Sequence, residues 1–423
     1  MPELSTDHSS ATLEGAHSHG GPRYVSSRAD RPTSFDPADI PVPRGREEEW
    51  RFTPMKRFAP LFDLDTIRAA TAAGETDAAA GAIRIETDLP DGARLETVSR
   101  SDARIGTVGA PVDRTGITAW NGTETATVLT LESGAQLERA ARLNVVGQDA
   151  QLARPTAQHI LVAAESGAKG TVVLDHTGTA ALTQGVEVTV ADGAELTLVT
   201  VQGWEDAAVH ASNHRVKVSG RGVLKHVVVS LGGDVRICPD LGFSGEGGHI
   251  DAYGVYFTDA GQHQEHRPYV AHTEPHCYSR VTYKGALQGE GAHAVWVGDC
   301  LIGQAARGTD TYELNRNLVL TEGAKADSVP NLEIENGNIE GAGHASATGR
   351  FDDQQLFYLR ARGIPETEAR RLVVLGFFNE IVAEIGVDEV EERLMAAIEK
   401  ELELTGLIAA RTDQDPVAVP AAE

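Results

Sequence analysis

The sequence predicts a mainly β protein whose strand-rich core, residues 83–349, lies between helical segments at both ends. The core contains short runs that alternate apolar and polar residues, such as VTVADGAELTLVTVQ (188–202) and DAYGVYFT (251–258). Glycine, which makes up 44 of the 423 residues, and Asp and Asn interrupt these runs at short intervals. No helical pattern lies between them, so βαβ units are not expected. From residue 352 onward the apolar spacing becomes helical.

The strand pattern by itself leaves three architectures of the core open. A solenoid buries such a pattern economically, because each coil packs only on its neighbours. The run is longer than most single sandwiches, and no strict sequence period is visible. A solenoid, a pair of sandwiches and a jelly roll therefore all remain possible at this point.

The two ends of the chain differ from the core in composition. Residues 1–40 are rich in Ser, His, Gly, Asp and Pro without periodicity, which is typical of a disordered lead. Residues 41–82 carry apolar side chains near helical spacing and are predicted to form a helical N-terminal domain. We assign residues 83–349 to the β core, 350–411 to a C-terminal helical domain and 412–423 to a Pro- and Ala-rich tail.

Two helices are predicted in the C-terminal domain. Apolar residues recur at intervals of three and four in the first, and at intervals of four in the second. The first set is Ala369, Leu372, Val373, Phe377, Ile381 and Ile385, and the second is Val390, Leu394, Ile398 and Leu402.

Composition and charge exclude several classes of partner. The formal net charge of −25 would repel a phosphate backbone, so we expect no nucleic-acid partner. No run approaches the roughly 20 apolar residues that a membrane helix needs, and the N-terminus does not read as a secretory signal. The three cysteines, Cys238, Cys277 and Cys300, have no CxxC spacing, which favours a reducing compartment. We expect a cytoplasmic protein without a membrane partner.

The common catalytic signatures are missing from the sequence. There is no GxxxxGK[ST], no GxSxG and no HExxH motif, so the sequence gives no sign of an enzyme of these kinds.

One segment, GQHQEHRPYVAHTEPHCYSR (261–280), is unusually rich in histidine. Its imidazoles and thiol are good ligands for iron or zinc, which raises the alternative of a metal-dependent enzyme. Strand geometry argues the other way, because the alternation of side chains does not place an HxxH pair on one face. The residues concerned are His263, His266, His272, His276 and Cys277.

A single histidine, His344, stands at the junction between the strand-rich core and the C-terminal helices. Iron–sulfur clusters are generally held by several thiolates, and three dispersed cysteines are too few for a complete site. If this chain handles iron and sulfur, we therefore expect it to share the site with a partner.

Four segments carry a resemblance to a known family. GHASATGRFDDQQLFYLRARGI (343–364) resembles the hallmark C-terminal stretch of the SufB/SufD iron–sulfur cluster assembly proteins. The run from Thr309 to His344, the segment GQHQEHRPYVAH (261–272) and REEEWRFTP (46–54) are also similar to family elements. The DxYxxNRNLxL run (310–320) is of SufD type rather than SufB type.

The resemblance implies a right-handed parallel β-helix core flanked by N-terminal and C-terminal helical domains. It implies a non-catalytic scaffold subunit of a SufBCD complex, which pairs with SufB through the β-helix and docks the SufC ATPase through the C-terminal helices. No cofactor would be bound permanently, and a transient iron–sulfur cluster or iron would sit at the SufB interface. Without SufB, the isolated chain could form a homodimer.

The resemblance also implies roles for particular residues. His344 matches the family histidine at the cluster site, whereas many SufD sequences read Cys-Ser-His where this chain has Ala342-Gly343-His344. His263, His272 and Cys277 are weaker metal candidates. The candidate SufC contacts are Phe357, Tyr358, Arg360, Arg362, Phe377 and Phe378. We expect either Phe357 or Tyr358 to pack within the helical domain, and residues 351–423 to be removable without unfolding the β-helix.

Overall fold

The structure is a computed structural model, and it describes residues 28–77, 79–351 and 353–404. Most of the predicted lead (1–40) and the whole predicted tail (412–423) lie outside the described residues. The short 3₁₀ helix η1 (Arg28–Asp30) belongs to a separate N-terminal unit, Met1–Arg31. All that follows concerns the second unit, which begins at Pro32.

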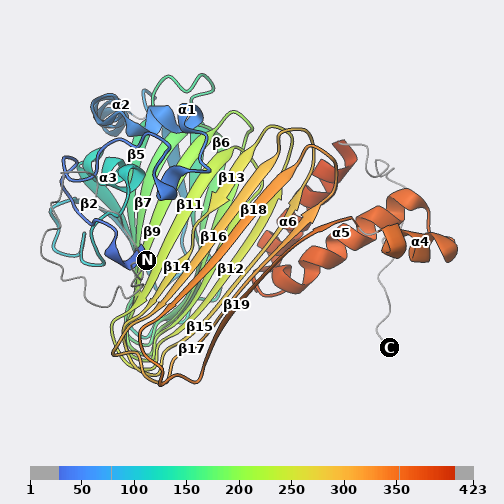
Figure 1. Ribbon diagram of the computed structural model, residues 1–423. Helices are drawn as coiled ribbons and strands as arrows, with labels where there is room; N and C mark the ends of the chain where they lie inside the picture. Colours follow the sequence, from blue (N-terminus) through green and yellow to red (C-terminus); the bar gives the residue numbers. More distant parts are fainter. Residues whose placement is uncertain (1–27, 78, 352, 405–423) are drawn as a thin grey trace, which may run out of the picture. The chain divides into compact units, whose positions relative to one another are not determined.

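The core is a parallel β-solenoid of about eight turns, which confirms the predicted β-helix (Figure 1). One sheet, which we call sheet A, has the order β1-β4-β6-β8-β10-β12-β15-β17-β19. The other, sheet B, runs β2-β3-β5-β7-β9-β11, then the pair β13 and β14, then β16, with β18 on β16. Successive strands of each sheet lie parallel and in register from β3 and β4 onward. A sandwich or jelly roll, both built from antiparallel strands, is therefore excluded.

The strands of sheet A are β1 (Ile83–Asp88), β4 (Ala141–Gln148), β6 (Lys169–Thr179), β8 (Glu195–Trp204), β10 (Val223–Ser230), β12 (His249–Thr258), β15 (Tyr278–Leu287), β17 (Asp310–Val319) and β19 (Gly341–Arg350). Those of sheet B are β2 (Ala93–Ser99), β3 (Thr125–Leu131), β5 (Thr156–Ala164), β7 (Ala181–Val190), β9 (Val209–Val218), β11 (Asp234–Phe243), β13 (His263–His266), β14 (Tyr269–His272), β16 (His293–Ile302) and β18 (Lys325–Ile334). β1 and β2 pair antiparallel to the first coil, at the N-terminal end of the solenoid.

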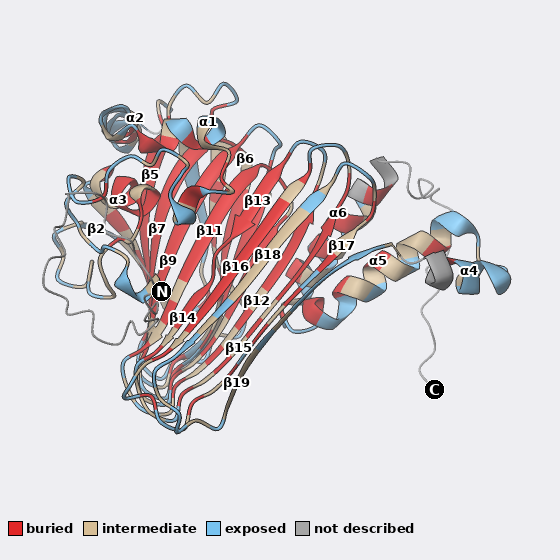
Figure 2. Cartoon of the chain, in the orientation of Figure 1, coloured by how far each residue is buried: buried red, intermediate tan, exposed pale blue. Residues whose placement is uncertain are grey.

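The apolar core lies between the two sheets, and the interior strands are buried along most of their length (Figure 2). A second apolar layer forms outside sheet A, where helices α5 (Glu366–Val382) and α6 (Asp388–Leu404) cover its outer face. The outer face of sheet B is covered near β7 and β9 by the N-terminal segment. Each sheet is thus buried on both sides along much of its length, which explains the nearly continuous runs of buried residues in β7 and β9.

The N-terminal segment is only partly helical. It contains η2 (Glu48–Trp50), α1 (Met55–Phe58), η3 (Ala59–Phe62) and α2 (Leu64–Thr76). A further helix, α3 (Arg114–Asn121), lies over β5 and β7 and was not expected from the sequence. Its eight residues are too few for periodicity to stand out, although Asp113 caps it by accepting a hydrogen bond from the Gly116 amide.

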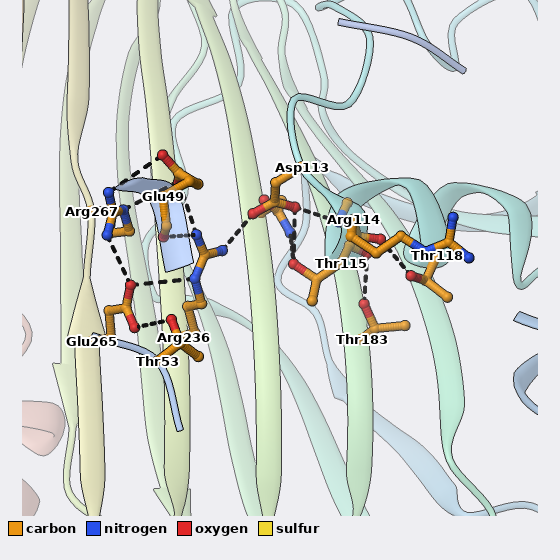
Figure 3. Close-up of polar contacts among 12 residues, drawn as sticks. Glu49, Thr53, Asp113, Arg114, Thr115, Thr118, Thr183, Arg236, Glu265 and Arg267 are labelled. Carbon is orange, nitrogen blue, oxygen red and sulfur yellow. Dashed lines mark hydrogen bonds and ion pairs between the residues drawn. The ribbon is translucent and has the colours of Figure 1, made fainter. Parts of the chain in front are cut away.

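A buried ionic network attaches this segment to the solenoid (Figure 3). Arg236 of β11 is fully buried, and its guanidinium contacts carboxylates of Glu49, Asp113 and Glu265. It also stacks on the ring of Trp50 at 4.0 Å. Although burial raises the pKa of the Glu265 carboxyl, a hydrogen bond from His263 and the charges of the nearby arginines hold it well below its usual value. The REEEWRFTP element therefore serves as an anchor.

The C-terminal helices follow α4 (Asp353–Ala361). In α6 the predicted face is confirmed, since Val390, Leu394, Ile398 and Leu402 are all buried. In the first predicted helix Ala369, Ile381 and Ile385 are buried as predicted, but the middle of the predicted face is shifted by one position, because consecutive apolar residues there do not identify the packed side. Val374 and Phe378 are buried there, while Leu372 is exposed.

Candidate functional site

The solenoid ends in two strands that have a neighbour on one side only. β19 is the last strand of sheet A and β18 the last of sheet B (Figure 1). The side chains of both strands are largely exposed or half-buried, in contrast to the interior strands (Figure 2). β19 (GAGHASATGR) carries small side chains apart from His344 and Arg350, so another backbone can approach it closely. Unpaired strand edges of this kind are templates for a partner strand.

His344 lies in β19 at this open end and is exposed. It pairs in register with Glu313 of β17, which is buried. The side chain of Asn317, which points into the solenoid, donates a hydrogen bond to the Thr348 hydroxyl (3.3 Å). The Thr348 side chain therefore also points inward. His344, four residues before Thr348, is therefore presented on the inner side of the last coil.

A polar layer lies directly beneath the last coil. Asn315 donates to the Tyr256 hydroxyl (2.9 Å) and accepts from Ser328 of β18 (2.7 Å). The Tyr256 hydroxyl in turn donates to Asn317. These hydrogen bonds make the layer beneath Ser346 and Thr348 of β19 polar rather than apolar.

The position where many SufD sequences carry a cysteine is apolar in this chain. Ala342 packs against Cys300, Ile302 and Ala306. Burial raises the pKa of the Cys300 thiol to about 12, and that of Cys238 likewise to about 12. Both thiols are therefore protonated in the metal-free chain.

The histidine-rich segment does not form one metal site. His263 faces outward from sheet B toward Glu265, whereas His266 points inward to Ser230 (2.9 Å). His272 contacts Ser279 (2.8 Å) inside the last coils, and the Cys277 thiol donates to backbone carbonyls. His276 is exposed in a loop. Among the described residues, no group of three or more His, Cys, Asp or Glu side chains converges to hold a metal ion. The histidines of this segment therefore point in different directions rather than toward one point.

A histidine pair does occur that the sequence did not reveal. Nδ1 of His263 lies 3.3 Å from Nδ1 of His293, which is 30 residues further along the chain. The two residues occupy the same register position in β13 and β16, one coil apart. Each follows a positive-φ glycine by two residues, Gly261 and Gly291, and this repeated turn is the signal that would have found the pair.

The predicted ATPase contacts divide into exposed and buried groups. Phe357 and Tyr358 of α4 are 74% and 54% exposed, so the expectation that one of them packs internally is wrong. Arg362 stacks on Tyr358 (4.3 Å), and Arg360 pairs with Glu366.

The prediction that Phe378 contacts the ATPase is wrong. It is fully buried in the apolar layer between α5 and sheet A, where no partner can reach it without opening that layer. Phe377 is half-buried beside Lys284 of β15.

Comparison with known proteins identifies the family. Residues 145–377 match the family described as SUF system FeS cluster assembly, SufBD core domain. The chain is 49% identical over 379 residues to an iron–sulfur cluster assembly SufBD family protein of Mycobacterium tuberculosis, covering 88% of this chain and 92% of that one. The chain belongs to the SufBD family. It is also 28% identical over 251 residues to the iron–sulfur cluster assembly protein SufD of Bacillus subtilis, covering 58% and 57% of the two chains.

As a SufBD family protein, the chain carries its matched core on the strands β4 to β19 and the first part of the helical segment. Among the helices that the structure describes, none is long and apolar enough to cross a membrane.

Proposed function

We propose that this chain is a non-catalytic scaffold subunit for iron–sulfur cluster assembly that works in the cytoplasm. It pairs through the open end of its solenoid with a SufB-type partner, and it docks a SufC-type ATPase through α4. The observation that carries this proposal is the coincidence of two unpaired sheet edges, β18 and β19, with an exposed histidine on the inner face of the last coil.

The pairing step rests on the properties of the two edge strands. An exposed strand without a neighbour gains main-chain hydrogen bonds when a partner strand is added. β19 suits such addition because its side chains are small, whereas β18 contains Pro330, which lacks an amide hydrogen. The partner strand is therefore expected on β19. In the absence of SufB, the same edge would pair two copies of this chain.

The cluster, or iron, is cargo at that interface rather than a resident cofactor. His344 offers an imidazole, which is a suitable ligand for iron. The buried thiols of Cys238 and Cys300 are held protonated, so the partner would supply the thiolates. Glu313, in register with His344, contributes a polar neighbour on the same face.

Docking of the ATPase is assigned to α4. Two adjacent exposed aromatic residues, Phe357 and Tyr358, lie beside Arg360 and Arg362. Aromatic residues and arginine are the types most enriched at binding hot spots. Movement of α4 can reach the solenoid through α5, whose Glu380 forms an ion pair with Lys284 of β15.

The cluster step is tested on the complete complex with His344→Ala. We expect cluster yield on reconstitution to fall while the subunits still copurify. The matched control is His276→Ala, another exposed histidine, which lies in the loop between β14 and β15 rather than on β19. Unchanged cluster yield with His344→Ala would assign this residue a structural role.

The pairing step is tested with Ala347→Lys in β19, since a lysine on an edge strand opposes strand addition. Loss of SufB copurification is expected, with Ala347→Thr retaining it. Gel filtration of the isolated wild-type and Ala347→Lys chains tests the homodimer in the same way. If Ala347→Lys still binds SufB fully, β19 is not the pairing edge.

The docking step needs point substitutions rather than a deletion. Removal of residues 351–423 would expose the apolar outer face of sheet A, which α5 and α6 cover. A truncated chain would therefore tend to aggregate, contrary to the prediction that these residues can be removed without consequence for the β-helix. Phe357→Ser with Tyr358→Ser alters only exposed side chains. It should abolish SufC copurification and leave SufB binding intact, and retained SufC binding would refute docking on α4.

A further inference from the structure

The His263–His293 pair has an arrangement of protons that sets it apart from the other histidines. Nε2 of His263 lies 3.2 Å from the Glu265 carboxylate, and Nε2 of His293 lies 2.7 Å from the Asp327 carboxylate. Each carboxylate also pairs with cationic side chains: Glu265 with Arg236 and Arg267, and Asp327 with Lys325. An ionised carboxylate only accepts hydrogen bonds, so each Nε2 must carry the proton and donate it.

A neutral imidazole with its proton on Nε2 presents a bare lone pair on Nδ1. With both rings neutral, the two Nδ1 lone pairs would face each other across 3.3 Å. Two such lone pairs repel, and a cation between them is needed to make the contact favourable. The candidates are a shared proton and a metal ion.

The distance between the two Nδ1 atoms fits a metal ion. An N–H donor and its acceptor are normally about 2.7–3.2 Å apart, and charge-assisted contacts lie at the short end of that range. Metal–imidazole bonds of about 2.0–2.1 Å at the tetrahedral angle place two nitrogen ligands about 3.3–3.4 Å apart. The observed 3.3 Å agrees with the second geometry.

The surroundings match those of bound metal ions. A metal-ligating histidine almost always donates its other ring N–H to a carboxylate or carbonyl, which fixes the tautomer and the ring orientation. Both histidines of this pair have such a carboxylate. The side chain of His263 is 2% exposed and that of His293 is 23% exposed, so solvent reaches the pair from one side. The nearby negative charges are Glu265, Asp327 and Asp234. The nearby positive charges are Arg57, Lys325, and Arg236 and Arg267, which both pair with Glu265.

We infer that His263 and His293 bind one divalent transition-metal ion of the Zn²⁺ or Fe²⁺ type on the outer face of sheet B, with water in the remaining positions. Imidazole suits both ions, and an open, water-bearing coordination sphere is compatible with only two protein ligands. The pair begins strands β13 and β16, whereas His344 lies near the middle of β19 in the other sheet. This metal site does not depend on the proposed function.

The test uses the full, tag-free chain with Co²⁺ and Zn²⁺ as probes. His17→Asn and His19→Asn are introduced into every variant, because these terminal histidines could bind metal weakly. We expect one equivalent of Co²⁺ to give the visible absorption typical of tetrahedral nitrogen ligation, and Zn²⁺ to displace it. Zinc titration calorimetry then measures the affinity.

His293→Gln should remove this absorption and weaken Zn²⁺ binding by more than about tenfold, since it deletes a ligand, and Asp327→Asn should weaken it about 10- to 100-fold. His249→Gln is the matched control. His249 donates to the Asp251 carboxylate at 2.9 Å as His293 does to Asp327, but it stacks on Tyr278 and faces no second imidazole. It should leave binding unchanged.

The same loss of absorption and of Zn²⁺ affinity is expected for His263→Gln. Because His263 is buried, circular dichroism is used to check that this variant folds. His293 is partly exposed, and its variant alone is sufficient to decide. Equal binding by wild type and His293→Gln would overturn the site, as would stoichiometric binding abolished by His249→Gln. Nitrogen-15 NMR of the metal-free chain gives a second readout: a shared proton would appear as one imidazolium at neutral pH, and that result would also overturn the inference.

Discussion

The interior of the solenoid should make the fold sensitive to mild acid. Among the buried histidines, five have their pKa lowered furthest and are held neutral: His210, His214, His226, His266 and His272. Burial lowers the pKa of His226 and His272 to about 4 and that of His266 to about 3, while the pKa values of His210 and His214 lie well below 6.5. In the unfolded chain each has a pKa of about 6.5.

The direction of the pH effect on stability follows from the difference in proton binding between the folded and unfolded chains. Between about pH 6.5 and pH 4 the unfolded chain binds these protons and the native chain does not, so the free energy of unfolding decreases as the pH falls. Five protons correspond to about 7 kcal/mol per pH unit well inside this window. At pH 5 the loss is on the order of 10 kcal/mol, which is comparable with the whole stability of a typical domain. Carboxyl groups with a lowered pKa, such as Glu265, change the stability only below about pH 4.5, so they do not contribute to the loss at pH 5.

Urea denaturation followed by tryptophan fluorescence between pH 5 and pH 7.5 measures this slope. His266→Gln keeps a partner for Ser230 and removes one titrating group, so it should reduce the slope by about one proton. His276→Gln, at an exposed loop position, should leave the slope unchanged. A slope below about two protons near pH 5.5, or an unchanged slope in His266→Gln, would refute the reasoning.

Three further predictions concern stability and reactivity. Arg236→Met should cost about 3–5 kcal/mol in urea denaturation, because Asp113 and Glu265 lose their buried counter-charge; Arg57→Met, which breaks a partly exposed pair, should cost no more than about 1 kcal/mol, and similar losses would contradict this. Gly285→Ala should destabilise by about 1–3 kcal/mol, since a Cβ there would lie 1.7 Å from the Tyr256 ring, whereas at Gly349 it meets nothing within 4 Å and Gly349→Ala should be nearly neutral. The native chain should not react with Ellman's reagent at pH 8 and should release three thiols after denaturation, because all three cysteines are buried; a rapidly reacting native thiol would show that one is accessible.

Local patterns in the sequence were enough to predict the features that depend on neighbouring residues. Alternation predicted the strands, helical spacing predicted the buried face of α6, and short motifs identified the family. Each of these patterns lies within a few consecutive residues, so it can be recognised without knowledge of the fold. Where the local pattern was ambiguous the prediction failed, as in α5, where consecutive apolar residues left the packed face open and Phe378 rather than Phe377 is buried.

Which distant residues meet is a property of the folded solenoid. The positive-φ glycines that precede the strands are 27 residues apart at Gly193, Gly220 and Gly247, but 30 and then 32 apart at Gly261, Gly291 and Gly323, so no fixed period marks the solenoid in the sequence. Coil length sets the register between coils, and register placed His263 opposite His293 and His344 beside Glu313. The separation of the His263–His276 segment into inward, outward and loop positions has the same cause, because strand direction and turn position, not sequence proximity, determine where each ring points.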